Sequence, residues 1–205
     1  MVRQTKENAE LTKTNIIAAA RQVFLEKGVS RTSMEQIATR AGVTRGAIYW
    51  HFANKTELFK AMREQVFIPL IDRMDDNLQL NSGDDPLTQL SDFLNGTIDI
   101  LNESSETRET YEIMMIKCEY VDDLAGVLEQ ILNNCACITE KIEQLYIRAK
   151  AKQQVKANQP PSELAIDTHL FFIGLLHMWV KDIEGKHFKN KATKLVQTHI
   201  NLRRN

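Results

Sequence analysis

Residues 33–52, SMEQIATRAGVTRGAIYWHF, decide the fold of the N-terminal part of this chain. They predict two short helices, one over about 33–40 and one capped by Thr44 over about 44–49, joined by a turn at Gly42. Three apolar side chains would bury the inner faces of the pair: Ile37, Val43 and Ile48. This spacing is typical of a helix-turn-helix, and the alternative is a helical hairpin inside an ordinary core.

The second short helix carries the residues expected to contact DNA. A recognition helix uses its first residues on base edges in the major groove, where Arg45 could bind guanine through two hydrogen bonds. Gly46 would let the backbone come close to the duplex, and Lys55 would add a phosphate contact. The complete expected set is Thr32, Ser33, Thr44, Arg45, Gly46, Tyr49, His51 and Lys55.

Helix signals flank this segment on both sides. Residues 11–27 place an apolar face at helical spacing, and Gly28 predicts the end of that helix. Thr32 and Glu35 match the spacing of a capping box at the start of the next helix. Asn54 and Glu57 repeat that spacing and predict the start of a long helix, whose apolar face is Leu58, Phe59, Met62, Val66 and Phe67.

The charge is unevenly distributed along the 205 residues, of which 43% are hydrophobic and 26% charged. Residues 1–60 hold 10 Lys and Arg against 5 Asp and Glu, a surplus of +5, and the remainder carries −6. A basic N-terminal segment fits nucleic-acid contact, although an excess of this size also arises by chance. We expect a cytoplasmic protein with no membrane partner, because no signal peptide or spanning apolar run is present.

The rest of the chain predicts further helices and thus an all-α protein of about nine helices. Asp85 followed by Pro86 predicts a helix start after a polar linker around Gly83, and further helices are expected over about 107–118 and 122–152. Ser162 is expected to cap a strongly apolar helix, and a last helix spans about 190–202. We assign residues 1–53 to a three-helix DNA-binding domain and 54–205 to a larger helical domain.

The stretch IIAAARQVFLEKGVSRTSMEQIATRAGVTRGAIYWHFANKTELF resembles the N-terminal domain of the TetR family. Within it, GVTRGAIYWHF followed by NKTELF is similar to the AcrR-like repressors of multidrug efflux pumps. The resemblance implies a C-terminal domain that binds a ligand and forms a homodimer through its last two helices. A two-fold dimer would bind a pseudo-palindromic operator in double-stranded DNA.

Two residue sets follow for that C-terminal domain. A pocket for a hydrophobic or cationic effector would be lined by Val66, Phe67, Leu90, Leu94, Tyr111, Met115, Ile138, Ile142, His169 and Phe172, the alternative being that most of them are ordinary core. The apolar helix after Ser162 would contribute Leu175, Leu176 and Trp179 to a dimer interface, the alternative being an internal core helix.

No catalytic, cofactor or metal motif is present, and three cysteines without a CxxC pair do not suggest a zinc site. We therefore expect no enzyme activity, no cofactor and no metal. The sequence favours a ligand-responsive repressor. The alternatives are a helix-turn-helix regulator switched by a protein partner, or an all-α enzyme or scaffold whose helix-turn-helix is incidental.

Overall fold

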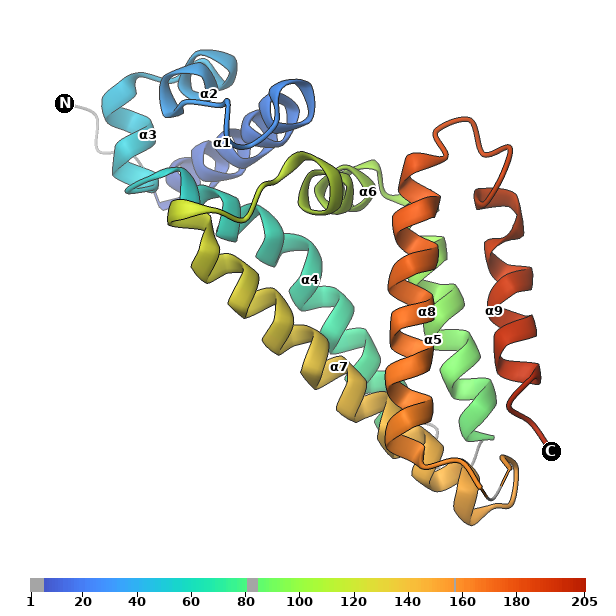
Figure 1. Ribbon diagram of the computed structural model, residues 1–205. Coiled ribbons are helices and arrows are strands. Elements are labelled where there is room, and N and C mark those ends of the chain that lie inside the picture. The colour runs from blue at the N-terminus through green and yellow to red at the C-terminus, as the bar shows by residue number, and fades with distance from the viewer. Residues whose placement is uncertain (1–5, 81–84, 157) are drawn as a thin grey trace. The chain divides into compact units, whose positions relative to one another are not determined.

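The computed structural model describes residues 6–80, 85–156 and 158–205, and the secondary structure in these ranges is almost entirely helical (Figure 1). Nine α-helices occur there, with one isolated bridge between Val155 and Arg204, so the all-α prediction is confirmed. The predicted linker around Gly83 lies outside the described residues.

The chain packs into two compact units. Unit 1 comprises Met1–Ile68 and Glu109–Leu128, and unit 2 comprises Pro69–Arg108 and Glu129–Asn205. Unit 1 thus draws on both of the domains assigned from the sequence, and the division after residue 53 stays a prediction about function.

Unit 1 is built around α1 (Lys6–Lys27), α2 (Met34–Ala41), α3 (Arg45–His51) and the first part of α4 (Lys55–Leu80). Helix α1 packs against α2, and the first three helices form the blue cluster of Figure 1. The predicted apolar face of α1 is confirmed, since its members are buried: Ile16, Ile17, Ala20, Val23 and Phe24. Burying such side chains stabilises the cluster by roughly 1.5–3 kcal/mol for each large one.

Capping residues set the helix boundaries of unit 1. Gly28 and Gly42 have positive φ angles of 82° and 68°, which confirms both predicted turns, because this conformation strains residues that carry a Cβ atom. Thr44 caps α3 by accepting a hydrogen bond from the Ala47 N–H. The predicted Thr32 cap of α2 is wrong: Ser33 caps α2, and its partner in the capping box is Gln36.

The remainder of unit 1 differs from the predicted continuous helix over 107–118. Helix α6 (Ser105–Glu112) gives way to a π-helical turn, η1 (Ile113–Lys117), and the chain is extended at Cys118. A short 3-10 turn, η2 (Asp122–Leu124), precedes α7 (Ala125–Ala151). Tyr120 fastens this segment to η1, since its hydroxyl donates to the Met114 carbonyl at 2.9 Å.

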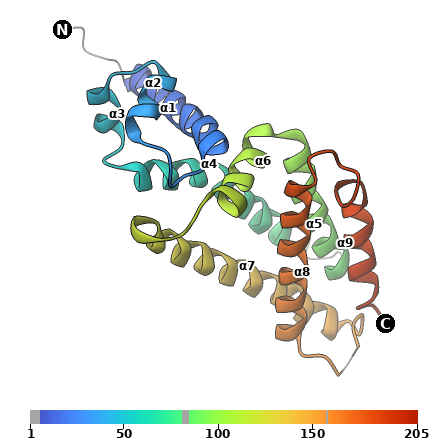
Figure 2. The ribbon, with the colours of Figure 1, turned by 45° about the horizontal axis from the view of Figure 1, so that its top comes forward.

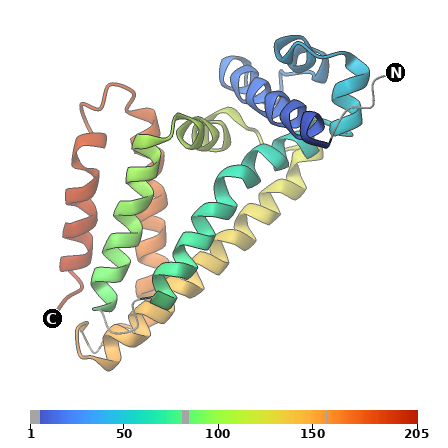
Figure 3. The same ribbon diagram turned by 180° about the vertical axis from the view of Figure 1, so that it is seen from behind.

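Unit 2 contains α5 (Pro86–Glu103), most of α7, α8 (Pro161–Lys181) and α9 (Ala192–Asn201), which follows the short turn η3 (Lys189–Lys191). Helices α5, α8 and α9 run side by side, as Figures 2 and 3 show from two directions. Asp85 caps α5 as predicted, whereas α8 begins at Pro161 with Pro160 at the cap, so the predicted Ser162 cap is wrong.

A buried polar network ties three helices of unit 2 together. The Tyr146 hydroxyl on α7 and the Thr168 hydroxyl on α8 lie 2.7 Å apart, and His199 Nε2 on α9 lies 3.1 Å from the same Thr168 oxygen. The ring of Phe171 stacks on His199 with 3.9 Å between centroids. Because buried polar groups must be paired, this network favours one arrangement of α7, α8 and α9.

Helix α8 is the described helix that is long and apolar enough to cross a membrane by length and composition alone. Half of the most apolar 18-residue stretch of α8 is buried inside the protein, as in the core helix of a soluble domain. Its apolar character is therefore accounted for in part by packing within unit 2.

Candidate nucleic-acid interface

Helix α3 presents an outer face to solvent and an inner face to the core of unit 1. Ile48 is fully buried, while Thr44, Arg45, Gly46, Tyr49 and Trp50 are exposed. The capping hydrogen bond at Thr44 fixes the first turn of the helix, and Gly42 fixes the preceding turn. The second helix of the helix-turn-helix is thus rigidly held with its N-terminal residues accessible, as major-groove contact requires.

Arg45 is a strongly exposed cation on this face, with 75% of its side chain accessible. Its Nε lies 3.5 Å from Glu35 Oε1 on α2, and its guanidinium lies 5.7 Å from the centre of the Tyr49 ring. An exposed ion pair of this kind contributes little stability and is readily exchanged. The Arg45 side chain therefore lies across the outer face of α3. Its weak ion pair with Glu35 can break in favour of a contact with a base edge or a phosphate.

Gly46 opens the surface beside Arg45. A Cβ atom at this position would have the Thr44 hydroxyl, at 3.9 Å, as its nearest neighbour, so no packing within the protein requires glycine there. The absent side chain instead exposes the backbone of the first turn of α3. This feature is consistent with the predicted close approach of the backbone to DNA.

Trp50 is a candidate contact that the sequence analysis missed. It follows Gly46 by one helical turn and is 70% exposed, and its indole packs edge-on against His51 with ring centroids 4.6 Å apart. A tryptophan that is so exposed on a soluble surface is a common sign of an interface. The signal in the sequence was the unbroken aromatic run from Tyr49 to Phe52, in which Phe52 alone is buried in the core.

His51 is half-buried, and burial lowers its pKa, as does the nearby Lys13 ammonium, while Glu10 opposes the shift. The imidazole is therefore neutral at pH 7. If His51 contacts DNA, it does so as a hydrogen-bonding group and not as a cation.

Two of the expected DNA-contact side chains are engaged within the protein. Thr32 is buried, and its hydroxyl donates to the Gly28 carbonyl at 2.7 Å. The Lys55 ammonium donates to the carbonyls of Val29, Ser30 and Thr32 at 2.8, 3.2 and 2.9 Å, and burial lowers its pKa. We call these three bonds the Lys55 clamp. Because the turn after α1 folds over the start of α4, the Lys55 charge faces carbonyls and not the solvent.

The same turn is also tied to η1. The Val29 N–H donates to the Lys117 carbonyl at 2.9 Å, and a Cβ atom on Gly28 would lie 3.4 Å from that carbonyl oxygen. One peptide segment thus contacts the start of α4, the start of α2 and η1. A shift of η1 or α4 is expected to reach α2 through these hydrogen bonds.

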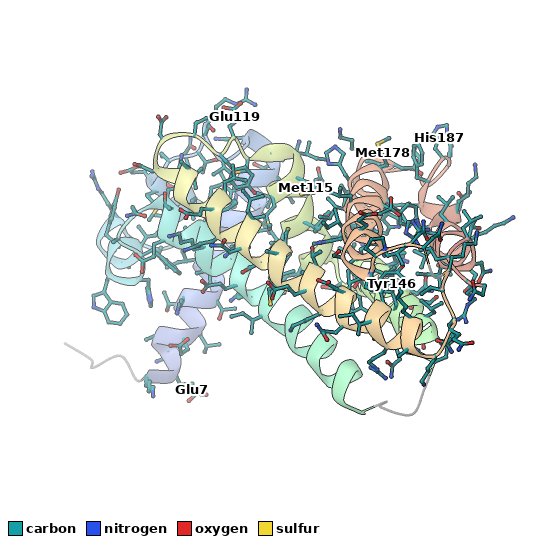
Figure 4. All side chains as sticks on the ribbon, turned by 60° about the horizontal axis from the view of Figure 1, so that its bottom comes forward. Glu7, Met115, Glu119, Tyr146, Met178 and His187 are labelled. Atoms are coloured by element: carbon teal, nitrogen blue, oxygen red, sulfur yellow. The ribbon has the colours of Figure 1, made fainter. Side chains whose placement is uncertain are left out.

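The residues expected to line an effector pocket belong to both units. Val66 and Phe67 on α4, Tyr111 on α6 and Met115 in η1 lie in unit 1, and Figure 4 labels Met115. The members in unit 2 are Leu90, Leu94, Ile138, Ile142, His169 and Phe172. All ten are buried or half-buried, and His169 is paired, since Thr139 Oγ1 lies 2.6 Å from its Nδ1. Their role as a pocket stays a prediction.

The three residues expected at a dimer interface face the interior of the single chain. Leu175, Leu176 and Trp179 are each at most 7% exposed, and the Lys189 ammonium lies 4.4 Å from the centre of the Trp179 ring. The opposite face of α8 carries exposed residues at a spacing of four: Ile166, Leu170, Gly174 and Met178. Packing within unit 2 therefore explains the burial of the three predicted residues. The exposed row on α8 is accessible to a second chain.

A rigid helix-turn-helix with an accessible arginine on its second helix, in an otherwise helical chain, defines a DNA-binding transcriptional regulator. Comparison with protein families agrees with this class. Residues 16–62 match the model of bacterial regulatory proteins of the tetR family, and residues 85–204 match the C-terminal region of MAATS-type transcriptional repressors. The chain belongs to the TetR family, whose members are regulators and not enzymes.

Full-length relatives show the same similarity. The chain is 30% identical to the HTH-type transcriptional regulator TtgR of Pseudomonas putida over 207 residues, covering 100% of this chain and 97% of the relative. The crystal structure of NalD, the secondary repressor of the MexAB-OprM multidrug efflux pump in Pseudomonas aeruginosa, is similar with a TM-score of 0.87 and 34% identity over 98% of this chain and 99% of NalD. The SmeT–triclosan complex has a TM-score of 0.82 and 27% identity over 95% and 92% of the two chains.

Proposed function

We propose that this protein is a cytoplasmic, homodimeric repressor of genes for a multidrug efflux system, and that a small apolar effector releases it from its operator. The observation that carries the proposal is the exposed outer face of α3, with Arg45 accessible on a helix that is capped at Thr44. Similarity to NalD, described as a repressor of an efflux pump, supports the class of regulated gene. The SmeT–triclosan complex supports a small-molecule effector.

The proposed DNA contacts divide into two kinds. Arg45, Gly46 and Tyr49 would face base edges, and a two-bond contact between Arg45 and guanine is worth about 1–3 kcal/mol of discrimination. Ser33, Thr44, His51 and Trp50 would contact the backbone or the groove wall. We leave the side chains of Thr32 and Lys55 out of the contact set, because Thr32 is buried and Lys55 is held by carbonyls.

The proposed switch acts through hydrogen bonds within unit 1. An effector that favours a different position of η1 or of the start of α4 would move the segment that begins at Gly28, since Val29 bonds to Lys117 and to Lys55. This segment leads directly to Ser33, the cap of α2, so the helix-turn-helix would follow. By linkage, operator DNA must weaken effector binding by the same factor by which the effector weakens operator binding.

We place the dimer surface on the exposed row of α8 and not on the residues named from the sequence. Ile166, Leu170 and Met178 are apolar and exposed, and a Cβ atom on Gly174 would have no neighbour within 4 Å, which would allow close approach of a second helix. A hollow of about 290 Å³ continues this surface, lined in part by Met178, Ile183 and His187. Figure 4 shows Met178 and His187 at the same end of unit 2.

Operator selection from genomic fragments tests the proposal most broadly. The full-length protein is expected to enrich a pseudo-palindromic site near efflux-pump genes, and binding to that site should weaken steeply as salt rises. A panel of apolar aromatic compounds should then include molecules that release the site in an anisotropy titration. Selection of no specific duplex would reject the assignment as an operator-binding repressor.

A second candidate function is regulation by a protein partner without a small-molecule effector. The exposed apolar residues Ile183 and Leu202 would suit a partner surface as well as they suit a second copy of the chain. Operator selection followed by the compound panel separates the two. Specific DNA binding that no compound weakens would favour the protein-partner mechanism.

A further inference from the structure

Arg63 is a buried cation without an identified counter-charge. It lies on α4 in unit 1, is 5% exposed, and its Nε has no hydrogen-bond partner. Across the described residues, no carboxylate forms an ion pair with it. Burying a polar N–H without a partner costs free energy, so the Nε of this residue is a stability cost that packing alone does not explain.

Two aromatic residues, Phe59 and Tyr120, lie close to Arg63. Phe59, one helical turn earlier, packs edge-on against the Tyr120 ring with centroids 6.4 Å apart, and the Arg63 charge acts on the same tyrosine. Burial raises the pKa of Tyr120 well above its ordinary range, while the positive charge of Arg63 opposes that shift. The tyrosine is therefore neutral, and its hydroxyl donates to Met114 instead of pairing with Arg63 as a phenolate.

The neighbouring cation has its partners, and Arg63 does not. Lys55, two turns earlier on α4, is satisfied by three carbonyls of the turn after α1. Tyr120, on which the Arg63 charge acts, is hydrogen-bonded to the π-helical turn η1 at Met114, and π-helical turns occur frequently at functional sites. Val66 and Phe67, both expected from the sequence to line a pocket, follow Arg63 by three and four residues and so share its helix face.

We infer that Arg63 binds an acidic oxygen of the effector, and that the natural effector class is an apolar or aromatic molecule carrying a carboxylate or a similar anionic oxygen group. A guanidinium fork matches two carboxylate oxygens, and the burial of Arg63 would strengthen such a pair by excluding water. This inference rests on the proposed ligand response and replaces the expectation of a cationic effector, because a cation would be repelled by an unpaired guanidinium.

Three naphthalene probes that differ mainly in charge test the inference on the full-length protein. Titration calorimetry would compare 2-naphthoate, the neutral 2-naphthamide and the cationic 2-naphthylmethylammonium. Wild-type protein is expected to bind the carboxylate at least about tenfold more tightly than the amide, and the cation most weakly. In Arg63→Met, the carboxylate should lose this advantage while amide binding changes little. Arg63→Lys should keep part of it, and Lys60→Met, a charge removal on the same helix, should keep all of it.

The Tm of the ligand-free variants distinguishes a ligand-binding arginine from a structural one. If Arg63 only stabilised the fold, its replacement would lower the Tm. Removing an unpaired buried charge is expected to leave the Tm of Arg63→Met equal to or above that of the wild type. A Tm several degrees lower, together with an unchanged preference for the carboxylate, would show a structural role and overturn the inference.

The remaining outcomes separate this inference from the proposed function. Equal wild-type affinity for the carboxylate and the amide, with either one releasing operator DNA, would overturn the role of Arg63 and leave the ligand-responsive repressor intact. Failure of all three probes to bind at millimolar concentration would overturn the inference about Arg63, whereas the proposed function would fail only if operator selection yielded no specific duplex.

Discussion

Replacing Lys55 with methionine tests whether this residue stabilises the fold around the helix-turn-helix or contacts DNA directly. Methionine keeps much of the stem and removes the ammonium, so the carbonyls of Val29, Ser30 and Thr32 lose a shared donor. The Ser30 bond is exposed and water can replace it, whereas the bonds to Val29 and Thr32 are partly buried. Leaving two such carbonyls poorly satisfied costs about 1–3 kcal/mol each before relaxation.

We therefore expect Lys55→Met to lower the free energy of unfolding by roughly 2–4 kcal/mol. For a chain of this length, that loss corresponds to a fall in Tm of roughly 5–15 °C. Calorimetry would measure the Tm, and hydrogen exchange would report faster exchange at the Val29 amide, whose bond to Lys117 depends on the position of the same turn. Lys60→Met is the matched control, since it removes a cation from the same helix.

The refuting result is equally specific. A Tm within about 2 °C of the wild type, combined with weaker operator binding and a smaller salt dependence, would mean that Lys55 contacts a phosphate and that the clamp is not significant. Loss of operator binding that follows the loss of stability would instead support the clamp.

Three further predictions concern unit 2. His199 is buried, which lowers its pKa to about 4, so the protein should lose about 2–3 kcal/mol of stability as the pH falls from about 6.5 towards 4, since only the unfolded chain gains the proton; urea unfolding of His199→Gln should show a flatter pH profile, and an unchanged profile would contradict this. Asp182 accepts bonds from four consecutive N–H groups over 186–189, chiefly that of Phe188, which hold its pKa well below the ordinary value; Asp182→Asn should speed exchange of those amides about tenfold, and unaltered protection would argue against the carboxylate as their anchor. Leu170 is 65% exposed, so Leu170→Glu should leave the fold intact and yield monomers in sedimentation velocity, whereas an unperturbed dimer would move the interface elsewhere.

Local chemistry allowed much of the N-terminal fold to be predicted. Gly28 and Gly42 require positive φ, Thr44 and Asp85 supply side-chain caps, and the apolar face of α1 repeats at helical spacing. Each of these signals lies within a few residues of the feature that it determines. The start of α2 was misplaced by one residue because Thr32 and Ser33 both have a suitable partner three residues later, and only the buried bond from Thr32 to Gly28 separates them.

Features that depend on distant residues were missed. The Lys55 ammonium is hydrogen-bonded by carbonyls of a turn more than 20 residues earlier in the chain, and no local sequence pattern indicates this contact. Helix α8 is apolar around most of its circumference, so the sequence could not show which face unit 2 covers, and Leu175, Leu176 and Trp179 were named for a partner surface although unit 2 itself buries them. Arg63 resembles any helical surface cation until its burial is known.

Base discrimination by Arg45 is the most direct test of the central claim, that α3 contacts base edges of an operator. Anisotropy titrations would compare wild type, Arg45→Lys and Arg45→Ala on the selected operator and on operators with a substituted G·C pair in each half-site. We predict that wild type loses about 1–3 kcal/mol per altered half-site. Arg45→Lys should keep the salt dependence but lose this preference, and Arg45→Ala should bind all of the operators equally weakly. Retention of wild-type affinity and base preference by Arg45→Ala would contradict the account.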